Sequence, residues 1–333
     1  MLRVALLGAG RIGAIHAKTI NEHKQSQLVY VGDVLSEAAQ TLAVQYGAQA
    51  KEPEAILADS SIDAILIATS TDTHADLIEA ATNHKKAVLC EKPVDLSLER
   101  AKACLKASKA NAQPVMLGFN RRFDPNFTAL KAALDQGEIG KTELLSVTSF
   151  DPAPPPYNYI KVSGGLFRDM MIHDFDICCW LMGGPPQTLS ATASALTDCE
   201  IGKLGDVDTA VVTLQYADGR IAVIKNSRRA AYGYDQRIEL LGSKGLLSAG
   251  NVLENTVCKA THTGVCSAKP EHFFLERYAR AYALEWAAFV EALTLDKTLP
   301  TNLEDGIIAL AMAEAANTAL HCGKAVSLSE FLA

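Results

Sequence analysis

Short apolar runs alternate with segments of mixed polarity through the first 120 residues of the chain. Such runs, apolar along nearly their whole length, are typical of strands buried on both faces of a parallel sheet. They lie at 3–8, 28–33, 64–69, 87–91 and 115–119. Segments with a helical pattern separate them, at 12–23, 36–46, 73–84 and 97–110. This alternation predicts an α/β fold whose first domain, residues 1–120, is built on a doubly wound parallel sheet.

The pattern changes after residue 120. Strand-like runs occur at 142–150, 208–216, 220–227 and 237–242, and Ala217-Asp218-Gly219 is a hairpin turn between two of them. Two long helical patterns follow, near 275–293 and 303–321. Consecutive strands without intervening helices predict a second, α+β domain over residues 121–333, with a large, mostly antiparallel sheet that is open on one face.

Composition supports two domains and narrows the class of protein. The chain has 333 residues, 49% of them hydrophobic, and a net charge of −7, and this length exceeds one ordinary core. The sequence contains no run of basic residues that would indicate a nucleic-acid surface. It also contains no apolar stretch that approaches the length of about 18 residues that a membrane span needs. The apolar N-terminal run lacks a signal-type cleavage region. Eight cysteines without a CxxC pair favour thiols in a reducing compartment, so we expect a cytoplasmic protein.

A glycine-rich turn, Gly8-Ala9-Gly10-Arg11-Ile12-Gly13, follows the first predicted strand and opens the first predicted helix. Glycines in this position let the backbone approach a pyrophosphate, and the helix N-terminus supplies N–H donors. Asp33 ends the second predicted strand, where an acidic side chain binds ribose hydroxyls. An ordinary turn with a surface aspartate is the alternative. Because the context fits, the pattern predicts a Rossmann dinucleotide site.

Asp33 also bears on the choice of cofactor. A carboxylate there repels the 2′-phosphate of NADP, and the next three residues offer no cation, so NAD is favoured. Residues 69–74 follow the third predicted strand, and their hydroxyl groups suit either cofactor contacts or helix capping. The predicted cofactor-binding residues are Gly8, Gly10, Arg11, Ile12, Gly13, Asp33, Thr69, Thr71, His74, Glu91 and Lys92.

Lys92 ends a buried predicted strand within the sequence Cys90-Glu91-Lys92-Pro93-Val94. A lysine at the carboxyl end of such a strand, fixed by a proline, points into the crevice where a nicotinamide is expected. Desolvation in such a crevice helps a lysine to share a proton. On the sequence alone, a surface lysine before a turn is at least as compatible.

The stretch FRDMMIHDFD, residues 167–176, places acids around a histidine. It follows a proline-rich segment, 151–165, which we expect to be an irregular loop over a cleft. One helix over 169–182 would put Asp169, His173 and Asp176 on one face. Three interpretations stay open: a capped and solvated helix, a metal site, or a proton-handling pair in which an acid orients a histidine base. Because metal binding needs three or four convergent ligands, we predict no metal, and we expect structural roles for Asp174 and Asp176.

These motifs together resemble one known family. The combination GAGRIG, EKP and GG-x-FRDM-x-IHDFD resembles the glucose–fructose oxidoreductase / inositol dehydrogenase / rhizopine-catabolism family. The resemblance runs over nearly the whole chain, as far as TNLEDGIIALAMAEAANTALHCGKAVSL. Within the family, the segment DPAPPPYNYIKVSGGLFRDMMIHDFD is most similar to the bacterial NAD-dependent inositol 2-dehydrogenases.

The resemblance implies an activity, an assembly and a set of site residues. It implies NAD-dependent oxidation of myo-inositol to 2-keto-myo-inositol (scyllo-inosose), in a homotetramer that packs through the open sheet. It assigns catalysis to Lys92, Asp169 and His173, and the chemistry suits His173 as base, Asp169 as its orienter and Lys92 as alkoxide stabiliser or proton relay. The same three residues are predicted to contact the polyol, together with Asn120, Asp151, Asn158, Tyr159, Tyr232, Tyr234 and Gln236. Tyr232 and Tyr234 are expected to alternate along a strand.

Two other functions remain compatible with the sequence. The first is a dehydrogenase of the same family that acts on scyllo-inositol, another polyol or an aldose. The second is a non-catalytic NAD-binding sensor, which the joint presence of the three catalytic candidates disfavours. Arg121, Arg122 and Arg168 suit either a carboxylated or phosphorylated sugar or, more commonly, interdomain ion pairs.

Overall fold

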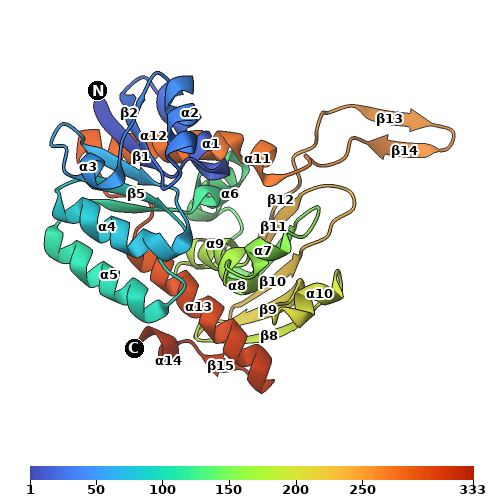
Figure 1. Ribbon diagram of the computed structural model, residues 1–333. Helices are drawn as coiled ribbons and strands as arrows, with labels where there is room; N and C mark the ends of the chain where they lie inside the picture. Colours follow the sequence, from blue (N-terminus) through green and yellow to red (C-terminus); the bar gives the residue numbers. More distant parts are fainter. The chain divides into compact units, whose positions relative to one another are not determined.

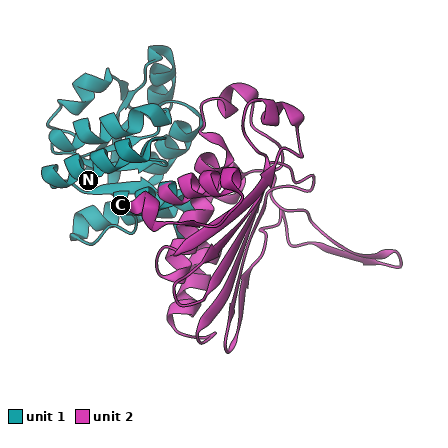
Figure 2. Ribbon diagram, turned by 90° about the horizontal axis from the view of Figure 1, so that it is seen from below, with its two compact units in different colours: residues 1–123, 281–310 teal, residues 124–280, 311–333 magenta.

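The computed structural model describes all residues from Met1 to Ala333, and the chain forms two compact units. Unit 1 comprises residues 1–123 and 281–310, and unit 2 comprises residues 124–280 and 311–333 (Figure 2). The structure therefore differs from the predicted division after residue 120 in one respect, because the chain returns to unit 1 near its end. The physical reason is that Trp286, Phe289 and Val290 belong to the hydrophobic core of unit 1.

Unit 1 is built on a parallel sheet of six strands in the order β3-β2-β1-β4-β5-β6, so the predicted doubly wound Rossmann sheet is confirmed. The strands are β1 Leu2–Leu7, β2 Ser26–Gly32, β3 Gln49–Ala50, β4 Ala64–Ile67, β5 Ala87–Glu91 and β6 Val115–Gly118. Every residue of β4 and β6 is buried, because helices cover both faces of the sheet (Figure 1).

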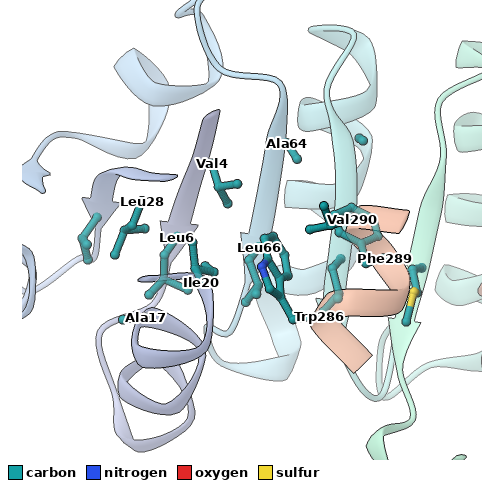
Figure 3. Packing of buried hydrophobic residues seen from close by; sticks show 14 of the residues in the cluster. Val4, Leu6, Ala17, Ile20, Leu28, Ala64, Leu66, Trp286, Phe289 and Val290 are labelled. Carbon is teal, nitrogen blue, oxygen red and sulfur yellow. The ribbon is translucent and has the colours of Figure 1, made fainter. Parts of the chain in front are cut away.

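The helices of unit 1 include the four that the sequence predicts, within two residues at each end. They are α1 Arg11–Glu22, α2 Ser36–Gln45, α3 Pro53–Leu57, α4 His74–Asn83, α5 Leu98–Asn111 and α12 Ala279–Leu295, with 3-10 turns η1 Thr71–Thr73 and η2 Asn120–Phe123. Figure 3 shows α12 side chains packed beside Leu66 of β4 and α1 side chains beside Leu6 of β1. Trp286 also donates a hydrogen bond from Nε1 to Ser26 Oγ over 3.0 Å.

Unit 2 is built on a mixed sheet of seven strands in the order β12-β11-β7-β10-β9-β8-β15, in which only the β7–β10 pair is parallel. The strands are β7 Thr142–Phe150, β8 Thr188–Ser194, β9 Thr209–Gln215, β10 Ile221–Ser227, β11 Asp235–Gly242, β12 Gly245–Ala249 and β15 Val326–Ser327. The predicted, mostly antiparallel sheet and its turn at Gly219 are confirmed.

One face of this sheet is covered by helices and the other is open (Figure 2). The unit 2 helices are α6 Pro125–Asp135, α7 Tyr157–Ile160, α8 Gly165–Asp169, α9 Ile172–Met182, α10 Cys199–Lys203, α11 Phe274–Arg277 and α14 Ser329–Leu332. Helix α13, Leu303–Cys322, continues from unit 1 into unit 2. Because α7 lies inside the proline-rich segment, the expectation of a wholly irregular loop over 151–165 was wrong.

Two parts of unit 2 are exposed: an apolar row on the open face of the sheet and a separate hairpin. A row of cross-strand neighbours crosses the open face of β12, β11, β7 and β10: Leu246, Leu241, Leu144 and Ile221, which are 55%, 43%, 39% and 42% exposed. A separate two-stranded hairpin, β13 Cys258–Thr261 and β14 Gly264–Ser267, projects away from the sheet in both views (Figures 1 and 2). No helix of either unit is long and apolar enough to cross a membrane.

Candidate active site

The glycine turn of unit 1 requires glycine at two of its positions. Gly8 has a φ of +105°, and a Cβ there would lie 2.3 Å from the carbonyl oxygen of Ala68. A Cβ on Gly13 would lie 2.0 Å from the carbonyl oxygen of Gly8. A Cβ on Gly10 would meet nothing within 4 Å, so the backbone is open to a ligand there. No side chain caps α1, whose first residues are Arg11 and Ile12, and its N-terminal N–H groups suit a pyrophosphate.

Asp33 is held against this turn by two backbone hydrogen bonds. Its Oδ2 accepts from the Ala9 N–H over 2.6 Å, and its Oδ1 accepts from the Leu35 N–H over 2.8 Å. A hollow of about 710 Å³ adjoins it, lined by Ala9, Val34, Leu35, Ser36, Glu37, Ala38, Thr41, Leu42 and Gln45. Val34 and Leu35 are 95% and 67% exposed there, as suits packing against a flat adenine ring. None of the lining residues is cationic, so the hollow fits NAD and lacks a partner for a 2′-phosphate.

The segment after β4 contains three further predicted cofactor residues. Thr69 Oγ1 and Thr73 Oγ1 lie 2.7 Å apart, and no side chain caps η1 or α4. His74 is buried, and its Nδ1 and Nε2 lie 2.8 Å from the Pro93 carbonyl oxygen and 3.2 Å from that of Thr69. Burial lowers the pKa of His74, so its imidazole is neutral and its one N–H serves one carbonyl at a time. Contacts of Thr69, Thr71 and His74 with the cofactor stay predictions.

The turn that carries Lys92 begins where β5 ends. Glu91 is the last residue of β5, and the Lys92–Pro93 peptide bond is cis. The Glu91 side chain points to α1, where its Oε1 lies 2.7 Å from Nε2 of the buried His16. The sequence analysis did not single out His16, although a histidine on the apolar face of a helix was a detectable signal.

The FRDMMIHDFD stretch in unit 2 does not form one helix, so the predicted helix over 169–182 was wrong. Helix α8 ends at Asp169 and α9 begins at Ile172. The backbone N–H groups of Met170 and Met171 both donate to the carbonyl oxygen of Leu166. The helical turn is therefore wider at that point, and the regular hydrogen-bond pattern of an α-helix is interrupted. Asp169 therefore precedes the break, and His173 lies in the first turn of α9.

Asp169 contacts a buried arginine that the sequence analysis missed. Both terminal nitrogens of Arg228 lie 3.4 Å from Asp169 Oδ2, and one lies 3.7 Å from Asp206 Oδ2. The Arg228 side chain is only 1% exposed. The Tyr159 hydroxyl donates to Asp169 Oδ1 over 2.8 Å. Arg228 directly follows β10, but nothing in its local sequence pairs it with a residue 59 positions earlier.

Asp174 is buried in a polar network behind this region. Ser149 Oγ lies 2.6 Å from Asp174 Oδ1 and 2.8 Å from Gln236 Oε1, and Asn226 donates to Asp174 Oδ2 over 2.8 Å. These contacts tie α9 to β7, β10 and β11, which confirms a structural role for Asp174. Asp176 is also buried.

The remaining substrate candidates differ in their surroundings. Asn120 is buried in unit 1, Asp151 is half-buried after β7, and Asn158 is exposed on α7. Tyr232 and Tyr234 were wrongly expected on a strand, because they lie in the turn before β11. The Tyr232 hydroxyl donates to Asp235 over 2.5 Å, whereas Tyr234 is buried against Tyr278. Contacts of all these residues with a substrate stay predictions.

Two of the candidate anion-binding arginines form ion pairs inside their own units. Arg168 pairs with Glu314 of unit 2 over 2.5 Å, and Arg122 pairs with Asp305 of unit 1 over 3.1 Å. Both arginines therefore form ion pairs, but within one unit each rather than between domains as the sequence predicted. No group of three or more His, Cys, Asp or Glu side chains in the structure is arranged to hold a metal ion.

Both units match known protein families. A family model described as an oxidoreductase family with an NAD-binding Rossmann fold matches residues 2–119, and a GFO/IDH/MocA C-terminal domain model matches residues 127–248. The chain is 48% identical to an inositol 2-dehydrogenase of Rhizobium meliloti, over 95% of this chain and 96% of that protein. It is 35% identical to a scyllo-inositol 2-dehydrogenase (NAD(+)) of Bacillus subtilis, over 98% and 96% of the two chains. A crystal structure of a myo-inositol dehydrogenase from Corynebacterium glutamicum, 43% identical, covers 98% of this chain and 99% of its own with a TM-score of 0.95.

Proposed function

The chain belongs to the GFO/IDH/MocA family of NAD-binding oxidoreductases, and on this premise we propose that it oxidises a ring hydroxyl of myo-inositol to 2-keto-myo-inositol. One observation carries the proposal: Asp33, Lys92, Asp169 and His173 occur together in a chain 48% identical, over nearly its whole length, to a protein named inositol 2-dehydrogenase.

NAD supplies the acceptor for the hydride that leaves the alcohol carbon. The glycine turn and the N-terminus of α1 would hold its pyrophosphate, and Asp33 would bind ribose hydroxyls of the adenosine half. The exposed side chains of Val34 and Leu35 would pack against the adenine. The acidic and neutral lining of this hollow favours NAD over NADP.

The residues of the chain handle the hydroxyl proton. His173 accepts the proton as the hydride departs, because a neutral imidazole is a base suited to neutral pH. Asp169 stabilises the imidazolium, and the Arg228 and Tyr159 contacts hold Asp169 in its orientation. Lys92 stabilises the negative charge that develops on the substrate oxygen. A neutral polyol is bound by hydrogen bonds from polar groups such as Asn158 and Tyr232, which are both exposed.

NADH formation tests this function directly. The purified protein is assayed by absorbance with myo-, scyllo- and chiro-inositol and with glucose, each with NAD and with NADP. We expect the highest kcat/KM with myo-inositol and NAD. A higher kcat/KM with scyllo-inositol or an aldose would favour the alternative substrate within the family. Tight NAD binding without turnover of any substrate would favour the non-catalytic sensor.

A pair of histidine variants tests the assignment of the base. His173→Ala should lower kcat by about 100-fold or more, in the range typical of a general base. His321→Ala is the matched control, because His321 is exposed near the end of α13 and should leave kcat unchanged. Undiminished oxidation in His173→Ala would contradict the mechanism.

The open face of the unit 2 sheet supports a proposal about assembly. Leu246, Leu241, Leu144 and Ile221 form a continuous, exposed apolar row, and a lone two-stranded hairpin such as β13–β14 is marginally stable by itself. We therefore propose a homotetramer whose subunits pack through this face. All eight cysteines are free thiols, as suits the reducing cytoplasm in which we place the protein.

A further inference from the structure

Three ionisable side chains of unit 1, two of them buried and one partly buried, lie around the strand end that precedes Lys92. Glu91 ends β5, His16 comes from α1, and Glu285 comes from α12, a helix nearly 200 residues later in the sequence. His16 Nε2 and Glu91 Oε1 are 2.7 Å apart. Gly118 of β6 leaves room for the Glu91 carboxylate, since a Cβ there would lie 3.2 Å from Glu91 Oε2. Neither His16 nor Glu285 has been given a role in the proposed reaction, and Glu91 has been named only as a predicted cofactor-binding residue.

Glu285 is fully buried, and neither of its carboxyl oxygens has a hydrogen-bond partner. An ionised carboxylate in that position would be very unfavourable. Burial, reinforced by the nearby Glu91 carboxylate, raises the pKa of Glu285 well above 4.5. Burial without a hydrogen-bond partner therefore favours the neutral carboxylic acid form of Glu285.

The other side chains around this cluster fix its geometry. The His16 ring packs edge-on against Tyr282, one turn before Glu285 on α12, with ring centroids 5.5 Å apart. His74 of α4 binds the Pro93 carbonyl on the far side of Lys92, and it lies within the electrostatic reach of both Glu91 and Lys92. Two buried histidines thus hold the residues immediately before and after Lys92.

Lys92 directly follows Glu91 at the start of the turn after β5, so an anchored Glu91 restrains the backbone from which the Lys92 side chain extends. We propose that His16 and Glu285 are positioning residues: His16 anchors the Glu91 carboxylate, the buried and unpartnered Glu285 completes the cluster, and together they fix the direction of the Lys92 side chain. The network itself is a property of unit 1, and only its benefit to catalysis rests on the proposed function.

Thermal unfolding at different pH values tests the state of Glu285 without any activity measurement. The folded protein keeps this proton above pH 4.5, whereas the unfolded chain releases it. Its contribution to stability is therefore complete below pH 4.5 and declines as the pH rises toward the raised folded pKa. Glu285→Gln lacks this decline, so its melting temperature relative to wild type should rise by about 3–5 °C per pH unit between pH 5 and 7. Glu291→Gln, on the exposed face of the same helix, should show a constant difference.

Two substitutions of His16 test the positioning of Lys92. Glutamine keeps an N–H donor near the place of Nε2, and leucine removes it. Acetylation of Lys92 in the intact protein, followed by mass spectrometry, should be at least about threefold faster in His16→Leu than in wild type. The rate in His16→Gln should stay within about twofold of wild type. His84→Leu, at an exposed position, is the control.

The outcomes separate this inference from the proposed function. A pH-independent difference for Glu285→Gln, a wild-type labelling rate in His16→Leu, or equal rates in the two His16 variants would overturn the positioning role. If His16 served only to pack against its neighbours, Lys92 should be acetylated at equal rates in the two His16 variants. Where wild type oxidises a polyol, His16→Leu should lower kcat about 10-fold with little change in the KM for NAD, and His16→Gln should restore it. A wild type without polyol oxidation contradicts the proposed function, and the labelling and unfolding results still decide the network.

Discussion

Arg228 is the cation that contacts Asp169. Replacing Arg228 with methionine removes this charge and keeps a side chain of similar length. Both terminal nitrogens lie 3.4 Å from Asp169 Oδ2, and the arginine is 1% exposed. At an effective dielectric constant of about 20, unit charges at that separation attract by about 5 kcal/mol. Breaking a buried pair on one side typically costs about 3–5 kcal/mol. Because the Asp169 side chain is 15% exposed, we expect the lower half of that range for the loss in free energy of unfolding.

The measurement needs a signal from unit 2 alone. The chain has two tryptophans, Trp180 on α9 of unit 2 and Trp286 in unit 1, so a Trp286→Phe background leaves fluorescence that reports on unit 2. Urea titrations of this background with Arg228→Met and with Arg229→Met give the comparison. Arg229 is exposed and adjacent, so its change should cost less than about 0.5–1 kcal/mol.

A double-mutant cycle with Asp169→Asn identifies the cause of the loss. If the ion pair is responsible, the costs of Arg228→Met and Asp169→Asn should differ from additivity by about 1–3 kcal/mol. Equal destabilisation by Arg228→Met and Arg229→Met, or additivity within about 0.5 kcal/mol, would refute the reasoning.

Two further predictions concern the cofactor and the assembly. Asp33→Ser should raise the ratio of kcat/KM with NADP to kcat/KM with NAD by about 10-fold. The reason is that removing one charge near a 2′-phosphate relieves about 1–2 kcal/mol of repulsion. An unchanged ratio in steady-state assays would show that Asp33 does not discriminate between the two cofactors. Leu241→Glu should lower the mass of the assembly found by sedimentation velocity, because it places a charge within the apolar row of the open face. Val44→Glu, at an exposed position of α2, should leave this mass unchanged. An unchanged mass for Leu241→Glu would rule out this face as the interface.

Local pattern was sufficient to predict five of the six strands of the parallel sheet, four helices that flank them and the glycine turn, since each depends on a few neighbouring residues, whereas the short β3 and α3 were not predicted. The break between α8 and α9 escaped because the residues around Met171 have an ordinary helical pattern, and the widened hydrogen bonding to Leu166 is a tertiary outcome. Arg228 and Glu285 escaped for another reason. Each meets its partner only after distant segments pack, and a buried charged residue cannot be told from a solvated one without that packing.

The core of unit 1 also determines when unit 1 can finish folding during synthesis. Trp286 reaches Ser26 across 260 positions of the chain, and it packs with Leu66 in the same cluster. A nascent chain that has emerged only as far as the end of the parallel sheet exposes the apolar surface that α12 covers. Unit 1 can therefore reach its full stability only after the chain for unit 2 up to α11 has left the ribosome. Until then the exposed apolar surface is open to aggregation.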